Sequence, residues 1–223
     1  HILTFEKVFE QLRFKKLIGF TATPITDKKV TTWIDDVEFV QPYTLDKIFD
    51  VMVQSLDTKD LIEKDELVQD YNVVLQLEDM DKLKISEKET DGYTKRSLEE
   101  VYSNQANLDT LVEAYNKYAK GKKCIVFNAT TRINKIVLER FLKEGINAKL
   151  YDSVNDCEIN PKTNKKYNRK EILKWYDAED DACLINTNVF TTGFSNNEVE
   201  TILMNRATKS LSMFIQIAGR GSR

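Results

Sequence analysis

The chain has 223 residues, of which 41% are hydrophobic and 31% are charged, a balance typical of a globular protein that buries a core. Its formal net charge of −3 gives no general attraction to nucleic acid or to an anionic membrane, so any such binding must come from a local patch. No apolar run approaches the roughly 20 residues of a membrane span, and no membrane partner is expected.

The chain contains three cysteines, Cys124, Cys157 and Cys183, and a single histidine. Their spacing is unlike that of metal ligands, so no metal site is expected. Cys124 and Cys183 each lie within an apolar run and are predicted to be buried, reduced thiols. A reducing cytoplasm fits this use of cysteine.

The first part of the chain mixes short apolar runs with acidic stretches. Helical spacing of apolar residues predicts a helix over 5–14, and residues 15–20 (KKLIGF) are expected to form a short buried strand. A second helix is predicted over 43–56 and a strand over 70–77. The rest of residues 37–105 is polar and is interpreted as a connector.

From about residue 106, apolar strands alternate with amphipathic helices. The predicted strands are 123–127, 147–152, 181–186 and 199–204, and the predicted helices are 107–121, 132–145, 168–179 and 210–219. Gly121 and Gly145 are expected to end two of these helices. Strands that are apolar throughout and alternate with helices predict an α/β fold, with a parallel sheet covered by helices on both faces.

Two loops that follow apolar strands carry hydroxyl groups and a glycine. In GFTATP (19–24), Thr21 and Thr23 would lie at the carboxyl edge of a sheet, where α/β proteins bind ligands. The alternative is an ordinary turn at the end of a strand. NTNVFTTGFS (186–195) offers backbone N–H groups and hydroxyls that suit a phosphate oxygen, or it is a polar loop with one aromatic anchored in the core.

The chain ends on QIAGRGSR (216–223), after an apolar helical run. Phe214 and Ile217 are expected on its buried face. Gln216, Arg220 and Arg223 lie on neighbouring turns, where two guanidinium groups beside glycines suit a planar clamp on phosphate. The alternative is a solvated helix end whose arginines complement the helix dipole.

Together these segments resemble superfamily 2 helicases and translocases of the DExH type, in the branch of restriction-enzyme translocases and phage or repair helicases. GFTATP is similar to motif III, CIVFNAT (124–130) to motif IV, NTNVFTTGFS to motif V, ATKS (207–210) to the segment between V and VI, and QIAGRGSR to motif VI with its arginine fingers. The order of the motifs matches, and the resemblance covers nearly the whole chain, with loose agreement in the connector and over 152–168.

The resemblance implies a RecA-like fold and an ATP-dependent helicase or translocase. Residues 1–36 would be the C-terminal part of the first RecA-like lobe, residues 37–105 a connector, and residues 106–223 the second lobe. The implied partners are nucleic acid, with DNA favoured over RNA, and an N-terminal RecA-like lobe missing from this chain. A bacterial or phage-encoded protein of the cytoplasm is expected.

The resemblance also assigns roles to individual residues. Arg220 and Arg223 would contact the γ-phosphate across the cleft between the lobes and stabilise the charge that develops during transfer, and Gln216 would help to sense the nucleotide. The other residues expected near the nucleotide are Gly193, Thr21, Thr23, Gly219 and Ser195. The residues expected to contact nucleic-acid phosphates are Thr191, Thr192 and Thr208, with Thr130 and Arg132 at a helix start as weaker candidates.

Several features depart from the family pattern. The chain has no GK[ST] phosphate loop and no acidic pair of motif II, so ATP and Mg²⁺ would be bound mainly by residues outside it, and the fragment alone is not expected to hydrolyse ATP. His1 is either the last residue of a DExH box or a tag remnant. Ser195 stands where the family has aspartate, which keeps open a degenerate domain that acts as a nucleic-acid-binding scaffold.

An insertion over residues 153–170 carries a cluster of lysines and arginines that includes Lys165 and Lys166. Such a basic loop could follow the phosphates of a nucleic-acid strand, with Tyr167 available for stacking. The alternative is an ordinary solvated loop. A third functional reading, beside the helicase and the scaffold, is a restriction-type motor that translocates without separating strands.

Overall fold

A computed structural model describes the following parts of the chain: Gln11 and residues 16–19, 29–34, 37–42, 49–53, 56–69, 71–89, 91–151, 159–160, 165–166, 169–187 and 198–221. The chain divides into two compact units, His1–Ser55 and Leu56–Arg223.

In the first unit, β1 (Lys29–Ile34) and β2 (Val37–Pro42) form an antiparallel hairpin in which Lys29 pairs with Pro42 and Ile34 with Val37. The two strands, KVTTWI and VEFVQP, are rich in β-branched and aromatic residues, which favour strands. This hairpin was not predicted from the sequence, although the composition of its strands is typical of β-structure.

Two predicted elements of the first unit are wrong where the structure describes them. Residues 16–19, expected within a buried strand, have no regular structure, and Ile18 is 74% exposed. Residues 49–53, expected within a helix, are irregular and present exposed apolar side chains. A buried parallel strand needs neighbouring strands to pair with, and no described strand is paired with residues 16–19. Of the helix predicted over 5–14, only Gln11 lies within the described residues, and it is helical.

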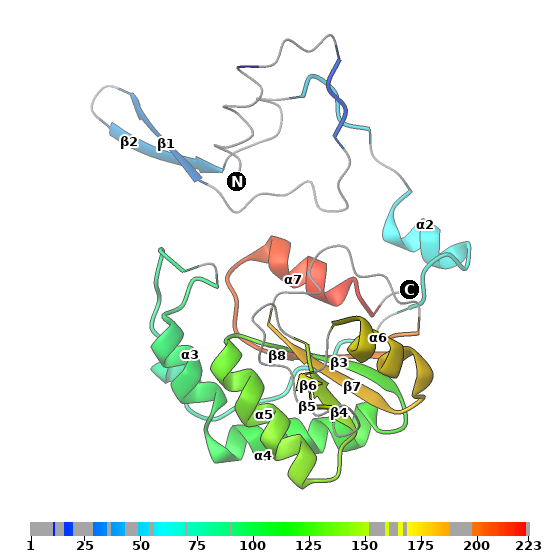
Figure 1. Ribbon diagram of the computed structural model, residues 1–223. Helices are drawn as coiled ribbons and strands as arrows, with labels where there is room; N and C mark the ends of the chain where they lie inside the picture. The colour runs from blue at the N-terminus through cyan, green and yellow to red at the C-terminus, as the bar shows by residue number, and fades with distance from the viewer. Residues whose placement is uncertain are drawn as a thin grey trace. The chain divides into compact units, whose positions relative to one another are not determined.

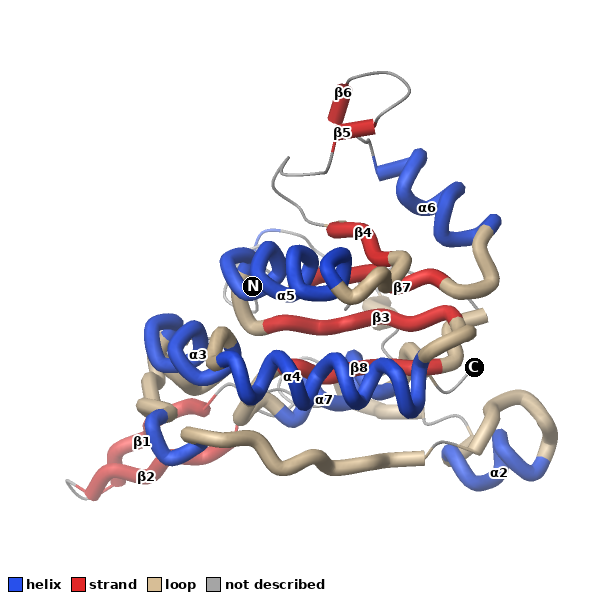
Figure 2. Tube along the Cα trace, turned by 90° about the horizontal axis from the view of Figure 1, so that it is seen from below, coloured by secondary structure: helices blue, strands red, loops and turns tan. Residues whose placement is uncertain are grey.

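The second unit is built on a four-stranded sheet with strand order β4-β7-β3-β8 (Figures 1 and 2). Its strands are β3 (Lys123–Asn128), β4 (Ala148–Leu150), β7 (Ala182–Asn186) and β8 (Thr201–Asn205). All three strand pairs are parallel. The prediction of a parallel sheet over the second half of the chain is confirmed.

The helices of this unit are α2 (Thr58–Glu63), α3 (Lys95–Tyr102), α4 (Gln105–Ala114), α5 (Thr131–Lys143), α6 (Arg169–Ala178) and α7 (Leu211–Ala218). One 3₁₀ turn spans Met80–Lys82, and α4 continues into a π-helical turn, Tyr115–Ala119. A short hairpin, β5 (Ile159–Asn160) and β6 (Lys165–Lys166), lies within the basic insertion. Helices α2 and α3 fall in the stretch that was interpreted as a connector.

Helices cover both faces of the sheet, and neighbouring residues of one strand contact different helices because they point to opposite faces. On β3, Val126 packs with α3, α4 and α5, whereas Phe127 packs with α6 and α7. Figure 1 shows α4 and α5 below the sheet and α7 above it. Every residue of β3 and β7 is buried, so each face forms a separate apolar core. Burying one such side chain contributes about 1.5–3 kcal/mol.

Local signals explain where the helices begin and end. Thr130 caps α5 by accepting a hydrogen bond from the backbone N–H of Ile133, and Gly145 follows α5 with φ of +74°. Gly121 has φ of +78° after the π-helical turn. Both glycines end helices as predicted, because this backbone conformation is costly for other residues.

Cys124 and Cys183 are paired in register on β3 and β7, and both are buried and free. Burial raises the pKa of the Cys183 thiol, since the thiolate would lose its hydration. The prediction of buried, reduced thiols is confirmed. Cys157 lies outside the described residues.

Candidate functional site

Three neighbouring strands of the sheet end on a buried asparagine. Asn186 ends β7, Asn128 ends β3 and Asn205 ends β8. In the sheet register Asn128 lies beside Asn205, and all three side chains belong to residues that are at most 6% exposed. The carboxyl edge of a parallel sheet is where α/β proteins place their ligands, so this polar edge is a candidate site.

Hydrogen bonds join two of these asparagines to the loops that leave the sheet. The side-chain amide of Asn205 donates to the side-chain oxygen of Asn128 at 2.6 Å, and the Asn128 amide donates to Asn134 on α5 at 2.9 Å. The amide of Asn134 in turn donates to the hydroxyl of Thr187 at 3.2 Å. Because buried polar groups are costly when unpaired, this chain of bonds holds the starts of three loops in one arrangement.

Arg206 connects this edge to the segment before α3. Its guanidinium forms a buried ion pair with Asp91 and donates to the backbone oxygen of Thr187 at 3.1 Å. The Arg206 side chain is only 1% exposed. Breaking such a pair would leave an uncompensated charge in the interior, so the Arg206–Asp91 pair fixes residues 91–93 to the sheet edge.

Gly92 allows the backbone of residues 91–93 to approach the chain at Lys209 closely. A Cβ on Gly92 would lie 2.8 Å from the Cβ of Lys209, and its φ is +76°. The backbone N–H of Lys209 donates to the backbone oxygen of Asp91 at 2.8 Å. Glycine is therefore required by both conformation and space.

The residues predicted to contact nucleic acid occupy different environments. Thr130 is buried and its hydroxyl caps α5, whereas the Arg132 side chain is 73% exposed and lies 3.4 Å from Glu99. The hydroxyl of Thr208 accepts from the backbone N–H of Ser210 just before α7. Lys165 and Lys166 form β6. Of this set, Arg132 presents an exposed charge close to the sheet's carboxyl edge.

Helix α7 carries the residues predicted to contact the nucleotide. Its cap is Ser210, whose hydroxyl accepts from the backbone N–H of Met213, and Gln216 donates to the Ser212 hydroxyl at 3.3 Å. Gly219 ends the helix, and Arg220, which is half-buried, follows it. The backbone N–H of Arg220 donates to the backbone oxygen of Ile217.

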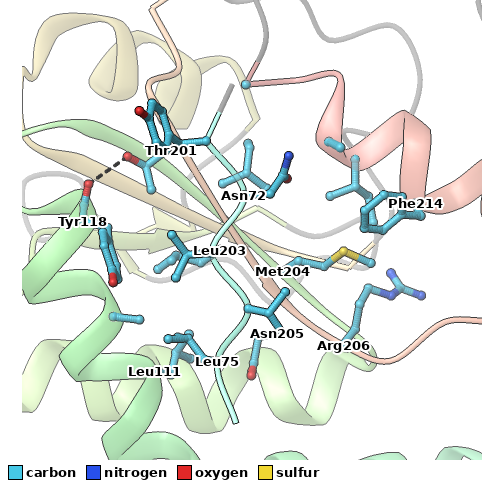
Figure 3. A pocket seen from close by; sticks show the side chains of 18 of the residues that line it. Asn72, Leu75, Leu111, Tyr118, Thr201, Leu203, Met204, Asn205, Arg206 and Phe214 are labelled. Carbon is cyan, nitrogen blue, oxygen red and sulfur yellow. Dashed lines mark hydrogen bonds between the residues drawn. The ribbon is translucent and has the colours of Figure 1, made fainter. Parts of the chain in front are cut away.

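One expectation for this helix is wrong. Ile217 is fully buried, but Phe214, expected on the same buried face, is 46% exposed. Phe214 instead lies toward an open groove beside β8 (Figure 3).

The end of α7 returns to the beginning of β8. A Cβ on Gly221 would lie 3.0 Å from Cγ1 of Ile202, the second residue of that strand. The turn that carries Arg220 therefore lies near the start of β8, at the opposite end of this strand from Asn205. Gly221 serves close packing against β8 at this point.

The remaining predicted site residues lie outside the described residues, and the structure does not test them. They are Thr21, Thr23, Thr191, Thr192, Gly193, Ser195 and Arg223. Within the described residues, no group of three or more His, Cys, Asp or Glu side chains is placed to hold a metal ion, and no helix is long and apolar enough to cross a bilayer.

The role of the asparagines and the Arg206–Asp91 pair were not predicted from the sequence. The signal was an asparagine closing each of three apolar runs, KCIVFN, ACLIN and TILMN. Each asparagine is unremarked in its own segment, and only the sheet register brings two of them into contact. Asp91 and Arg206 are 115 residues apart, so no local pattern links them.

Comparison with known families accounts for the larger part of the chain. The family model described as helicase conserved C-terminal domain matches residues 106–223. This chain belongs to the helicase C-terminal domain family. The parallel sheet with its two helical layers is the RecA-like α/β fold expected of the second helicase lobe.

One curated relative extends over almost the whole chain. A "51.5 kDa protein" of Lactococcus phage (isolate 7-9) is 24% identical over 221 residues, which is 99% of this chain. The matched region is 43% of that relative, so this helicase C-terminal chain spans less than half the length of the phage protein.

Proposed function

We propose that this chain is the C-terminal motor half of an ATP-dependent nucleic-acid helicase or translocase of the DExH type, acting on DNA. The observation that carries the proposal is the helicase C-terminal domain over 106–223, which ends on a glycine–arginine turn directly after α7. Arg220 in that turn is half-buried, as suits a guanidinium that contacts a phosphate at a lobe surface.

In this proposal the nucleotide is held mainly by another RecA-like lobe. The chain has no GK[ST] loop, and its described residues offer no carboxylate cluster for Mg²⁺. Bound ATP with Mg²⁺ supplies the phosphoryl group that is transferred to water. Arg220, with Arg223, would stabilise the negative charge on the γ-phosphate as its bond to the β-phosphate breaks, an effect of about 1000-fold or more on the rate.

The nucleic acid would lie at the other end of β8, along the carboxyl edge of the sheet. The loops that start after Asn128, Thr187 and Arg206 leave from this edge, and hydrogen bonds made by buried side chains hold their first residues. Because the first residues of these loops are held in place, a small movement of the lobe would be transmitted through the loops to the phosphates that they contact. Arg132 and the basic β5–β6 insertion would add local positive charge to a chain whose net charge is −3.

The test uses the longer protein that contains both lobes. ATP hydrolysis is measured alone and with single-stranded DNA, double-stranded DNA or RNA, and DNA is expected to stimulate turnover most. Hydrolysis that no nucleic acid stimulates, from a protein that binds ATP and is folded, would rule out the motor function and favour a nucleic-acid-binding scaffold. Ser195, in place of the expected aspartate, is the feature that favours this second candidate.

A second pair of assays separates a helicase from a restriction-type translocase. Displacement of the third strand of a DNA triplex reports movement along a duplex, whereas release of a labelled strand reports unwinding. A helicase is expected to be active in both assays. Activity in the triplex assay alone would instead identify a translocase that does not separate strands.

A further inference from the structure

The side chain of Lys209 is exposed but held in place. Lys209 lies in the segment that leads from β8 into α7, directly before the cap residue Ser210. Its ammonium nitrogen lies 5.8 Å from the centroid of the Tyr93 ring. Its backbone N–H donates to the backbone oxygen of Asp91, and its methylene groups lie against Gly92. A lysine side chain has much rotational freedom to lose, and here the contacts with these neighbours restrict it.

The residues that surround this ammonium belong to one loop before α3. A β-bridge between Ile85 and Tyr93 closes the loop, here called the edge loop (residues 85–89 and 91–93). The buried ion pair between Asp91 and Arg206 fastens the edge loop to the end of β8. Figure 1 shows the loop above α3, beside the chain that leads into α7. The ring of Tyr93 therefore has a fixed place beside the start of α7.

The start of α7 is an unfavourable place for a cation unless an anion is bound there. The N-terminal end of a helix carries a partial positive charge, so anions stabilise it and cations do not. Lys209 directly precedes the cap of α7, which spans the eight residues Leu211–Ala218. The charge of Lys209 and the helix dipole therefore add to one positive potential, which favours the binding of an anion.

The carboxylate beside Lys209 is already neutralised. Asp91 is 8% exposed, and its charge is paired with Arg206. Glu87 and Glu89 of the edge loop are exposed, and within the described residues neither forms an ion pair with Lys209. The π-face of the neighbouring tyrosine attracts the ammonium without removing its charge. The positive charge therefore remains available to an anion from solution.

Lys209 lies on the side of the lobe where nucleic acid is proposed to bind. Its segment leaves the carboxyl end of β8, and Thr208, an expected phosphate contact, directly precedes it. Arg132 lies at the start of α5, which leaves the same edge of the sheet, and it contacts Glu99 of α3, the helix that follows the edge loop. A strand along this edge would meet an ammonium at the start of α7 and a guanidinium at the start of α5. In a chain with a net charge of −3, affinity for nucleic acid depends on such local charges.

We propose that Lys209 binds a phosphate of the DNA backbone, and that Tyr93 and Gly92 hold its side chain in the binding position. This assignment rests on the proposed function, because it adds a contact to the DNA site of the motor. A phosphate contact carries no base specificity, so Lys209 would contribute affinity for every DNA sequence. Since the side chain is already ordered, little further rotamer freedom would be lost on binding.

The salt dependence of DNA binding tests this contact in the longer protein that contains both lobes. Binding of a fluorescent oligodeoxythymidine is measured without ATP at about 50 to 200 mM salt. Lys209→Gln keeps a long polar side chain but removes the charge. It should make the slope of log affinity against log salt concentration shallower by about 0.7, and weaken binding roughly tenfold at about 50 mM salt. Lys143→Gln is the matched control, because Lys143 is exposed in the last turn of α5, at the opposite edge of the sheet, and both quantities should stay unchanged.

Substitutions of Tyr93 test the role of the edge loop. Tyr93→Phe keeps the ring and should bind DNA as the wild type does. Tyr93→Leu should weaken binding about two- to fivefold and keep the slope, because the charge remains but is no longer held over a ring. Urea denaturation establishes that each variant is folded in the binding assay. Wild-type affinity in Tyr93→Leu would overturn the positioning role of the edge loop.

The outcome for Lys209→Gln also separates this contact from the motor function. A wild-type slope in the folded variant, when DNA binds the wild-type protein and stimulates its ATP hydrolysis, would overturn the Lys209 contact and leave the motor function standing. Absence of DNA binding by the wild-type protein would overturn both.

Discussion

The side-chain amide of Asn205 donates a 2.6 Å hydrogen bond to the side-chain oxygen of Asn128, so the last residues of two neighbouring parallel strands are joined above the sheet. Asn134 extends this link to Thr187, where the loop of the predicted motif V begins. In a protein proposed to couple nucleotide state to nucleic-acid binding, these hydrogen bonds at the carboxyl edge of the sheet hold the first residues of the loops in a fixed arrangement.

Asn134→Ala is expected to lower the free energy of unfolding by about 2–3 kcal/mol, because it leaves the buried amide of Asn128 without its acceptor. Asn147→Ala is the matched control, since the side-chain amide of Asn147 also donates a hydrogen bond, to the backbone oxygen of Asp181, but is exposed. Its effect should stay near 0.5–1.5 kcal/mol or below. Urea denaturation measures both, and equal losses would contradict a special role for the buried chain of bonds.

Arg206→Ala is expected to cost about 3–5 kcal/mol, because it leaves Asp91 as an unpaired charge in the interior. Arg132→Ala removes a second arginine–carboxylate pair, but one whose arginine is largely exposed, and should cost at most about 1 kcal/mol. The double variant Asp91→Leu with Arg206→Met should be more stable than Arg206→Ala alone, since no buried charge is left. A double variant no better than Arg206→Ala would contradict this explanation.

Stability should fall at alkaline pH through three tyrosines. Burial raises the pKa of Tyr102, Tyr115 and Tyr176, and a hydrogen bond to Asp181 adds to the effect at Tyr115. A raised pKa in the folded state stabilises the fold below the unfolded value of about 10, and this contribution is lost progressively as pH rises above 10.

Urea midpoints measured from pH 8 to 11.5 test this expectation. The free energy of unfolding should decline above pH 10 by up to about 1.4 kcal/mol per pH unit for each buried tyrosine. Tyr176→Phe should make this slope shallower by about 1.4 kcal/mol per pH unit, which corresponds to one proton. A slope unchanged by that substitution would show that other groups cause the decline.

The two core thiols should be unreactive in the folded protein. In a Cys157→Ser background, a thiol-specific reagent is expected to modify neither Cys124 nor Cys183 until denaturant is added, because both are buried and burial raises the pKa of Cys183. Modification of two thiols per chain once the protein is unfolded would confirm that both cysteines are buried and reduced. Rapid modification of either thiol under native conditions would show that the β3–β7 pair opens readily.

Local sequence was sufficient for the four strands of the parallel sheet and for α4 to α7, but not for α2 and α3, which fall in the stretch interpreted as a connector. Residues 71–77, predicted within a strand, belong to no strand in the described residues. The strands β3 and β7 are uninterrupted apolar runs, and α5 combines helical spacing with a threonine cap and Gly145. These signals act over a few residues, so they could be identified without knowing what packs against them.

The features that could not be predicted from local sequence depend on partners that are distant in the chain. Phe214 has the spacing of a core residue, but its exposure is set by the groove beside β8, whose far side is formed by residues 71–77. Residues 16–19 resemble a buried strand, yet no described strand pairs with them. The Asn205–Asn128 bond and the Arg206–Asp91 pair likewise appear only when the sheet register and the loop before α3 are known.

The measurement that bears most directly on the proposed motor is the separation of ATP binding from ATP turnover in Arg220→Ala, made in the longer protein with saturating DNA. Arg220→Lys keeps the charge without the planar fork, and Arg96→Ala, an exposed arginine on α3, is the control. We expect the dissociation constant for ATP to change little in Arg220→Ala while kcat falls by about 1000-fold or more, with Arg96→Ala unchanged. Wild-type turnover in Arg220→Ala would contradict the claim that this turn completes the catalytic site.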